Sequence, residues 1–555
     1  MLVALFFSSD GVAQAEGTVT NCTETNLRAA MAGGGTVTFA CDGTITLSGT
    51  ISNSLATVLD ATGHQITISG GNSVRVFLVP LNSTLTLKNL TISGGRSPDG
   101  TNGMYDGINA TPGGPGAPGG GLCNLGSLEL QTCTVAANRS GKGGNGSGIN
   151  TYGGANSAGG DGGSGGGIFN AGSLSLSNCV VTGNTTGNGG AGGGSLTYYP
   201  AGGSGGRGGG ICNAGTLTMQ NSTVQYNGTG LGVDNPLRGP GSSGGDGAGV
   251  WSSGSFASSG CTFFANTNGA GGKGGASDMV GGPGARGGSG GGIYTEGNAA
   301  LTNCTVAGNV TGAGGAGGIG YGLPPMGHNG STGANGSGAG LCASSNLEMV
   351  NGTVAANQVG GGIANLGGPA LLLNSIVAGN IGTPGDVSGT FVSLGHNLIG
   401  TTNGSSGFSV PNDLVGSNPL LLDPQCGPLA PNGGPTLTMA LLPGSPAIDA
   451  GSSAGAPATD QRGVARPQGS GVDIGAFEYQ FPVFTQFNYQ NATNCRMQIA
   501  GLLPNLTYTL EASSNLVNWS TVTGFVAGTN GMCQITDATL SHWPTHFYRL
   551  KSGAP

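Results

Sequence analysis

Few residues in this sequence could do chemistry, because charged side chains make up only 7% of the 555-residue chain. Hydrolysis of a glycosidic bond needs two carboxylates at a set separation, and lyase chemistry needs a base beside a cation. Eight acids lie between residues 119 and 400: Glu129, Asp161, Asp234, Asp246, Asp278, Glu296, Glu348 and Asp386. They include no D-x-D pair, and no histidine shares a register with any of them. We therefore assign no catalytic residue.

Histidine, cysteine and glycine patterns do not predict a bound cofactor or metal. The five histidines, which are scattered, are His64, His328, His396, His542 and His546. No C-x-x-C pair occurs, although the chain has 12 cysteines, so a zinc site is not predicted. The glycine runs lack both G-K-[ST] and a regularly placed aspartate, which excludes phosphate loops and calcium-binding nonapeptides.

A sequence repeated seven times provides the elements that must position any site. Each copy has a glycine run, an aliphatic residue, two short alternating segments and a closing asparagine, as in 165–184. The aliphatic residues are Leu122, Ile168, Ile211, Val250, Ile293, Leu341 and Ile363. The last two are 22 residues apart, which is about one turn of a parallel β-helix. A unit this short cannot bury its own apolar face, so the copies must stack.

The longer spacings contain glycine-rich insertions, for example 141–164 and 269–289. Glycine accounts for 121 residues and falls in patches, unlike the strict period of collagen. These insertions have too few apolar side chains to form a packed turn. We predict loops that leave one corner of the coil, all on the same side.

The most regular column formed by stacking the copies is asparagine. Its members are Asn138, Asn184, Asn227, Asn266, Asn309, Asn357 and Asn380. Asparagine tolerates the left-handed backbone of a tight corner, and its amide can bond the equivalent amide one turn away. We predict a structural asparagine ladder; a ligand site is the alternative.

Two other columns each have a structural interpretation and a functional alternative. Cys133, Cys179, Cys261 and Cys304 point inward and are predicted to be buried thiols; a redox or metal role is the alternative. An outward threonine column is typical of a strand face, and ice binding is its alternative. It contains Thr134, Thr223, Thr262, Thr305 and Thr353.

The first 118 residues predict an export signal followed by the start of the coil. Residues 2–7 are apolar and are followed by the A-x-A site Ala13-Gln14-Ala15, so that 1–15 is typical of a signal-peptide remnant. Alternating segments in 16–118 predict a cap and the first turns, covered by a short helix over 26–31. Cys22 with Cys41, and Cys495 with Cys533, are candidate disulfides within single modules. No later stretch is apolar for the ~20 residues that a membrane span needs.

The repeat resembles a known family through its G-G-G-I-x-N opening and N-C-T-V-x-x-N close. It is similar to the right-handed parallel β-helix repeats of the pectin-lyase-like superfamily, especially the polymorphic outer-membrane protein type. The resemblance implies a bacterial protein that is extracellular or associated with the outer membrane.

Residues 397–480 resemble the choice-of-anchor Q domain. The resemblance lies in Asn418–Pro424, Asn432–Thr436, Pro443–Gly451, Thr459–Gly463 and Val472–Glu478. This segment concentrates charge in a charge-poor chain: Asp449, Asp460, Arg462, Arg466, Asp473 and Glu478. We predict that they form a network that closes the C-terminal end of the coil. A bound cation and a catalytic cluster are the alternatives.

Residues 481–555 form a separate module with short alternating strands. Thr507–Trp519 and Phe547–Leu550 resemble a small C-terminal β-sandwich of secreted bacterial proteins. The predicted domains are 1–15 (signal remnant), 16–118 (N-terminal cap), 119–396 (glycine-rich β-helix), 397–480 (anchor-Q-like cap) and 481–555 (sandwich).

The predicted fold is all-β: a right-handed parallel β-helix solenoid with glycine-rich corner loops and a small C-terminal β-sandwich. The net charge of −8 and pI near 5.0 make nucleic acid an improbable partner. We expect a non-enzymatic secreted or surface protein that acts in structure, adhesion or envelope interaction, with surface glycans or envelope components as partners. The alternative is a polysaccharide lyase or hydrolase, or a non-catalytic glycan binder.

Overall fold

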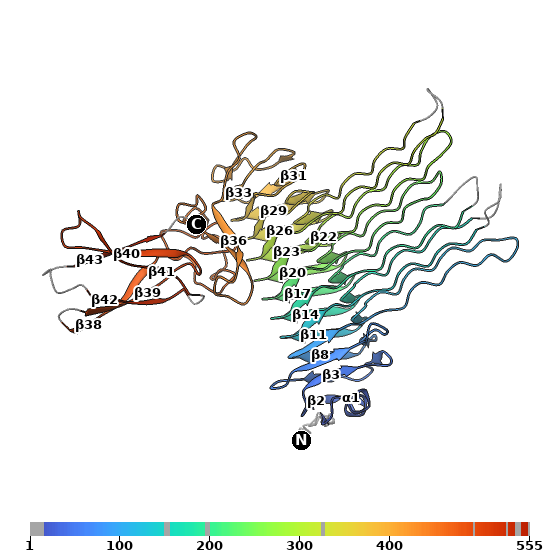
Figure 1. The fold of residues 1–555 in the computed structure, drawn as a ribbon, viewed down its shortest axis with the longest axis horizontal. Coiled ribbons are helices and arrows are strands. Elements are labelled where there is room, and N and C mark those ends of the chain that lie inside the picture. Colours follow the sequence, from blue (N-terminus) through green and yellow to red (C-terminus); the bar gives the residue numbers. More distant parts are fainter. Residues whose placement is uncertain are drawn as a thin grey trace, which may run out of the picture.

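The computed structural model describes residues 16–148, 156–194, 200–322, 328–491, 494–528, 531–538 and 546–552. The predicted signal remnant, 1–15, lies outside the described residues. The chain forms the predicted right-handed parallel β-helix, in which each turn gives one short strand to each of three parallel sheets (Figure 1). Three small antiparallel sheets follow in the C-terminal part.

The three sheets are numbered in the order in which a turn of the repeat visits them. Sheet 1 contains β4 (Ile51–Ser52), β7 (Phe77–Val79), β10 (Leu122–Asn124), β13 (Ile168–Asn170), β16 (Ile211–Asn213), β19 (Val250–Ser252), β22 (Ile293–Thr295), β25 (Leu341–Ala343), β28 (Ile363–Asn365), β31 (Val387–Thr390) and β34 (Ser405–Ser406).

Sheet 2 has the longest strands of a repeat. It contains β1 (Gly17–Val19), β2 (Gly35–Phe39), β5 (Thr57–Asp60), β8 (Thr84–Lys88), β11 (Ser127–Gln131), β14 (Ser173–Ser177), β17 (Thr216–Gln220), β20 (Ser255–Ser259), β23 (Ala299–Thr302), β26 (Leu347–Val350), β29 (Ala370–Leu373) and β32 (Val392–Ser393).

Sheet 3 completes each turn. It contains β3 (Gly43–Thr46), β6 (Ile66–Ser69), β9 (Leu90–Ser93), β12 (Thr134–Ala136), β15 (Val180–Thr182), β18 (Thr223–Gln225), β21 (Thr262–Phe264), β24 (Thr305–Ala307), β27 (Thr353–Ala355), β30 (Ile376–Ala378), β33 (Leu398–Ile399) and β35 (Leu414–Val415).

Equivalent residues of successive copies stack in register. Leu174 of β14 pairs with Leu128 and Leu217 of the adjacent turns, and all three are buried. Side chains alternate across a strand, so one aliphatic set from each strand fills the interior and the other set faces out. The core is therefore one continuous column of Leu, Ile and Val along the solenoid.

The N-terminal end is covered by α1 (Glu24–Met31), which buries Leu27 and Met31. Thr23 caps the helix by accepting from the Asn26 N–H, as N-terminal threonines do. A disulfide between Cys22 and Cys41 lies beside it.

The predicted asparagine ladder is continuous in the structure. From Asn138 to Asn357, each side-chain amide donates to the Oδ1 of the next member, 2.8–3.0 Å away. Asn380 ends the series by donating to Asp386. The left-handed backbone lies one residue earlier than the sequence argument places it. For example, Ala137 and Tyr226 have φ of 53° and 54°, and the ladder asparagines do not.

A second ladder follows sheet 1 and is absent from the sequence prediction. Asn124 donates to Asn170, Asn170 to Asn213, and Asn213 to Ser252, over 2.6–2.9 Å. The asparagine of the Ile-x-Asn opening was its signal.

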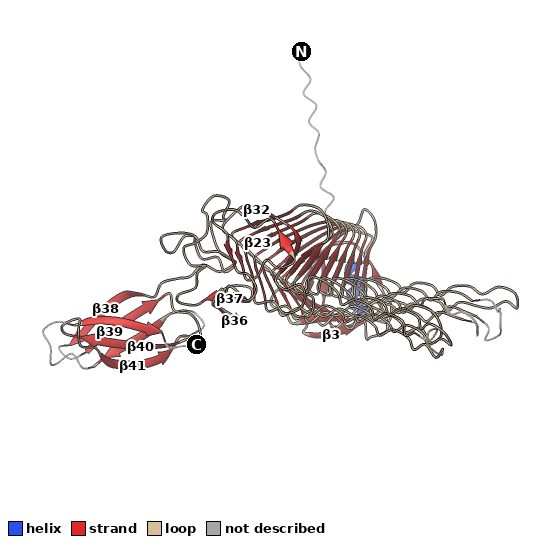
Figure 2. Ribbon diagram, turned by 90° about the horizontal axis from the view of Figure 1, so that it is seen from above, coloured by secondary structure: helices blue, strands red, loops and turns tan. Residues whose placement is uncertain are grey.

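The C-terminal part forms three small sheets. A hairpin of β36 (Cys426–Ala430) and β37 (Thr438–Leu441) belongs to residues 397–480. The last module has one sheet of β38 (Val483–Asn491), β39 (Asn494–Ala500) and β42 (Cys533–Asp537), and one of β41 (Ser520–Val526), β40 (Thr507–Ser513) and β43 (Phe547–Ser552). Figure 2 shows this module beside the coil.

The predicted pairing of Cys495 with Cys533 does not form. Both are free thiols, because strand register places Cys495 opposite Asp537 and Cys533 opposite Ile499. Cys495 and Ile499 are four residues apart on β39, which puts the two sulfur atoms beyond bonding reach.

Candidate functional site

The glycine-rich insertions form six hairpins, all of which leave the coil between sheet 3 and sheet 1. Each has an outgoing segment that follows sheet 3 and a return segment that leads into sheet 1. The described residues of hairpins 1 to 6 are 96–119, 139–148 with 156–165, 185–194 with 200–208, 228–247, 267–290, and 310–322 with 328–338. They stack into two layers that project from the coil (Figures 1 and 2). We call this element the glycine slab.

The slab is held by backbone hydrogen bonds at intervals of three residues. In hairpin 2, Gly143 and Gly146 donate to Asn188 and Ala191 of hairpin 3, in the same layer. Gly144 donates across the layers, to Gly114 of hairpin 1, 2.8 Å away. A three-residue period is that of the extended polyproline II conformation. The insertions are thus regular elements, where the sequence analysis predicts loops.

Glycine is required at two of every three positions because neighbouring backbones lie in contact there. A Cβ on Gly143 would lie 1.9 Å from the Gly160 oxygen, and one on Gly144 would lie 2.0 Å from the Thr101 oxygen. Both distances are far shorter than any contact between a carbon and an oxygen atom. The larger side chains of hairpin 2, such as Lys142 and Asn145, therefore stand at the third position, which points away from the slab.

Outward side chains satisfy the backbone donors on the slab surface. Asp99 Oδ1 accepts from the Lys142 N–H at 2.8 Å, and Asp234 Oδ1 accepts from the Lys273 N–H at 2.8 Å. Asn102 does the same for Asn145. Aspartate and asparagine therefore act as staples between adjacent hairpins.

Part of each free edge of the slab is blocked. Pro98 of hairpin 1 is at the position of Gly141 in hairpin 2. The Gly141 N–H donates to the preceding hairpin, and hairpin 1 has no preceding hairpin. Proline has no N–H group that would be left unpaired there. On hairpin 6, Asn335 and Asn329 accept from the N–H groups of Gly314 and Gly320. These groups reduce the number of edge donors that a further strand could pair with.

The far end of the slab exposes large apolar side chains. Those in the described hairpin ends are Met104, Ile108, Met279, Val280 and Tyr321, which are 55–81% exposed. These side chains make this edge a candidate contact surface.

The described acids of the slab are paired with basic side chains or backbone donors, whereas Glu129 of the coil accepts from the side chains of Gln131 and Thr86. Asp246 forms a two-point ion pair with Arg286, with both N–O distances 2.8 Å, and Asp278 pairs with Arg238. Within the described ranges, no group of three His, Cys, Asp or Glu side chains could hold a metal ion. These ion pairs connect neighbouring hairpins.

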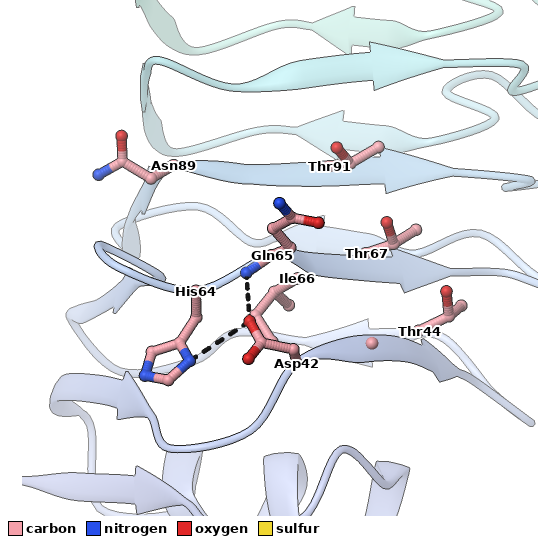
Figure 3. Close-up of a pocket in the computed structure, with 9 residues that line it drawn as sticks. Asp42, Thr44, His64, Gln65, Ile66, Thr67, Asn89 and Thr91 are labelled. Carbon is pink, nitrogen blue, oxygen red and sulfur yellow. Dashed lines mark hydrogen bonds and ion pairs between the residues drawn. The ribbon is translucent and has the colours of Figure 1, made fainter.

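A polar hollow of about 650 Å³ lies on the outer face of sheet 3 near the N-terminus. Its lining includes His64, whose Nδ1 is 3.4 Å from Asp42 Oδ1, and the hydroxyls of Thr44, Thr67 and Thr91 (Figure 3). The backbone N–H of Gln65 donates to Asp42 and lowers the pKa of that carboxyl. The threonine column stands apart from the His64–Asp42 pair in Figure 3. The hollow offers hydrogen-bonding groups.

The rest of the outward threonine column is covered by the segment 432–479. Gln461 donates to Thr262 and accepts from Thr305, and the Ala476 N–H donates to Thr353, over 2.6–3.0 Å. Only the N-terminal part of this column is accessible.

The charged network lies in that covering segment, on the side of the coil, whereas the sequence analysis places it at the C-terminal end. Its ion pairs are buried: Arg462 with Asp460 at 2.8 Å, and Arg466 with Glu478 at 2.7 Å. Asp473 accepts from the Asp449 and Tyr479 N–H groups, and Asp449 accepts from the Gly471 N–H. Burial raises the pKa of Asp473 to about 7. All of these ion pairs and hydrogen bonds join residues of the segment to one another.

The inward cysteines, Cys133, Cys179, Cys261 and Cys304, are buried. The Sγ of Cys133 lies 3.2 Å from the Leu87 carbonyl oxygen, as expected for a packed thiol. Cys212 and Cys342 lie on sheet 1, and burial raises the pKa of each to about 12.

Comparisons with protein-family models, curated proteins and solved structures give no significant match. Across the described residues, no helix has the length and apolar character to cross a membrane.

Proposed function

We propose that this chain is a secreted or cell-surface bacterial β-helix protein with a structural, adhesive or envelope-interaction role. The glycine slab carries the proposal. It projects a plate from the coil and exposes apolar side chains at the far edge. The resemblance to pectin-lyase-like repeats of the polymorphic outer-membrane type, and to choice-of-anchor Q domains, supports an extracellular or outer-membrane-associated location.

A plate with this construction suits contact with a large partner. Its backbone is already held by hydrogen bonds on two sides, so binding orders little further chain. Its tips present Met104 and Ile108 on hairpin 1, and Met279 and Val280 on hairpin 5. Surface glycans and other envelope components are the partners we propose.

The test replaces Met104, Ile108, Met279, Val280 and Tyr321 together by serine and measures binding to bacterial envelope fragments. We expect loss of most binding. The matched control replaces Leu366 and Ile381, which are 59% and 64% exposed and lie outside the slab. Equal binding by both variants would contradict the role of the slab.

A second candidate is glycan binding in the hollow beside Asp42. Sugar hydroxyls fit a surface of one carboxylate, one imidazole and a threonine column, and the hollow provides these groups. Asp42→Asn with His64→Ala should then weaken binding on a glycan array, whereas Asp106→Asn, on a hairpin tip, should not. Cleavage of acidic polysaccharides by the wild-type protein would favour a lyase or hydrolase instead.

A further inference from the structure

The outer face of the outgoing layer changes character along the solenoid. On hairpins 1 and 2 it carries Asp99, Asn102, Lys142 and Asn145. On hairpins 4 to 6 it is mostly apolar. Its outward apolar residues there are Leu231, Leu237, Ala270, Ala276, Met279, Ala313, Ala316 and Ile319, and its outward charged residues are Asp234 and Lys273. Leu231 and Ile319 are 50% and 52% exposed. A flat apolar patch of this extent marks an interaction surface.

Hydrogen bonds fix which residues of hairpins 4 and 5 stand side by side. Gly232 donates to the Ala270 oxygen, which places Leu231 beside Ala270. Lys273 donates to Asp234 Oδ1, and Arg238 donates to the Ala276 oxygen, which places Leu237 beside Ala276. Along its length, hairpin 4 thus presents a large side chain, an acidic one and a second large one. Hairpin 5 presents a small side chain, a basic one and a second small one at the corresponding positions.

This pattern is complementary to itself. We propose that a second copy of this chain binds face to face here. The two-fold axis lies between hairpins 4 and 5 and runs parallel to their outgoing segments. The axis places Leu231 over Ala270 of the other copy, and Leu237 over Ala276. Asp234 lies over Lys273, and each pairing occurs twice because the interface is isologous.

The flanking hairpins 3 and 6 fit the same axis. It brings Ala316 over Ala191, which sets a small residue against a small one. A polar-against-apolar contact occurs only at Asn188 over Ala313, at the base of the slab. No like charges face each other.

The area is sufficient for a dimer of moderate affinity. Four hairpins at about 4.8 Å spacing, and nine residues at about 3.1 Å rise, cover roughly 19 by 28 Å. That buries about 530 Å² on each copy, or about 1,100 Å² in total, which just exceeds the ~1,000 Å² expected of a specific interface.

Charge reversal tests the arrangement by sedimentation equilibrium of the full chain. Asp234→Lys, and Lys273→Asp separately, should each weaken the dimer by at least about tenfold, because two like-charged contacts form. The double variant should restore the affinity to within about threefold. Asp99→Lys is the matched control: it removes the same type of N–H acceptor, from Lys142, outside the interface.

A steric pair tests the same face independently. Ala276→Arg should give a monomer, and Ala201→Arg, on the return face, should leave the dimer intact. Circular dichroism checks that both variants fold. A wild-type monomer at about 100 μM, where a micromolar dimer would be complete, overturns the proposal. So does a dimer that Asp234→Lys and Ala276→Arg leave unchanged, or a different protein captured by this face of a monomeric chain.

Discussion

Gly190 packs so closely on Gly144 that a methyl group on Gly190 would lie 1.9 Å from the Gly144 carbonyl oxygen. The same relationship recurs through the slab, between hairpins that are neighbours in space and about 43 to 46 residues apart in sequence. Backbone contact on this scale explains why the insertions are so rich in glycine.

Gly190→Ala should therefore open the slab locally while the coil stays folded. Overpacking of a tight interior costs about 1–3 kcal/mol, and a backbone oxygen cannot move aside as a side chain can. We expect faster amide hydrogen exchange and faster proteolysis across hairpins 2 to 4.

The control for that change is Gly228→Ala. Its Cβ would meet the Thr185 methyl group at 3.6 Å and the Thr267 carbonyl oxygen at 3.7 Å, both ordinary contacts. Equal exchange rates in the two variants would show that backbone proximity does not limit this position.

The asparagine ladder should be sensitive to a single deletion. Asn227 bonds Asn184, Asn266 and the Val181 carbonyl, all buried. Asn227→Ala leaves several buried groups unpaired, each costing about 1–3 kcal/mol, so we expect a loss of at least about 3 kcal/mol. The thermal midpoint measures it.

An exposed amide pair provides the comparison for the ladder. Asn346 donates to Asn298 at 3.0 Å on the surface. Water can replace that bond, so Asn346→Ala should change the free energy of unfolding by no more than about 0.5 kcal/mol. A similar loss in both variants would mean that burial does not set the cost.

Asp473 should make stability fall as pH rises. Burial raises its pKa from 3.8 to about 7, so the folded state holds a proton that the unfolded state releases between those values. Stability from this group is fully present below about pH 4, decreases across pH 4–7 and is constant above. The wild-type thermal midpoint should decrease across this window relative to that of Asp473→Asn. A constant difference between the two proteins would argue against the raised pKa.

The cysteines should divide into ten thiols and one disulfide. Alkylation of the denatured, unreduced protein should modify ten residues, and reduction should release Cys22 and Cys41. In the native protein at pH 8, Cys212 and Cys342 should stay unmodified, because burial raises the pKa of each to about 12. Eight modified cysteines on mass spectrometry would instead indicate that a second disulfide, such as Cys495–Cys533, forms.

The coil could be predicted from sequence because its rules are local. The common parity of Ile168, Leu174 and Leu176 determines which face is inward, and all three are buried. Register then follows from the fixed length of a copy, and the repeated position of Asn184 and Asn227 aligns the corners.

The slab was harder to predict, although its signal is present. The backbone N–H groups of Gly141, Gly144 and Ser147 donate between layers at intervals of three residues. This period differs from the two-residue alternation by which strands are predicted. A glycine hairpin has no apolar face, so only its neighbours make it ordered.

The position of the charged segment depends on contacts that are remote in sequence. Gln461 reaches Thr262 across 199 residues, and Asn351 reaches Asp473 across 122. Local pattern identifies the ion-pairing residues Arg462 and Asp460, but it does not indicate which face of the coil receives them.

The partly blocked edges of the slab have a consequence for how such a protein can change over generations. Each interior unit, one coil turn with its hairpin, is 39 to 48 residues long and makes the same bonds to the unit on either side. Duplication or loss of an interior unit would therefore leave every remaining bond type intact. The first and last units, with Pro98 and with Asn329 and Asn335, cannot be exchanged in this way. The width of the plate is thus open to variation by recombination, while its two ends are constrained.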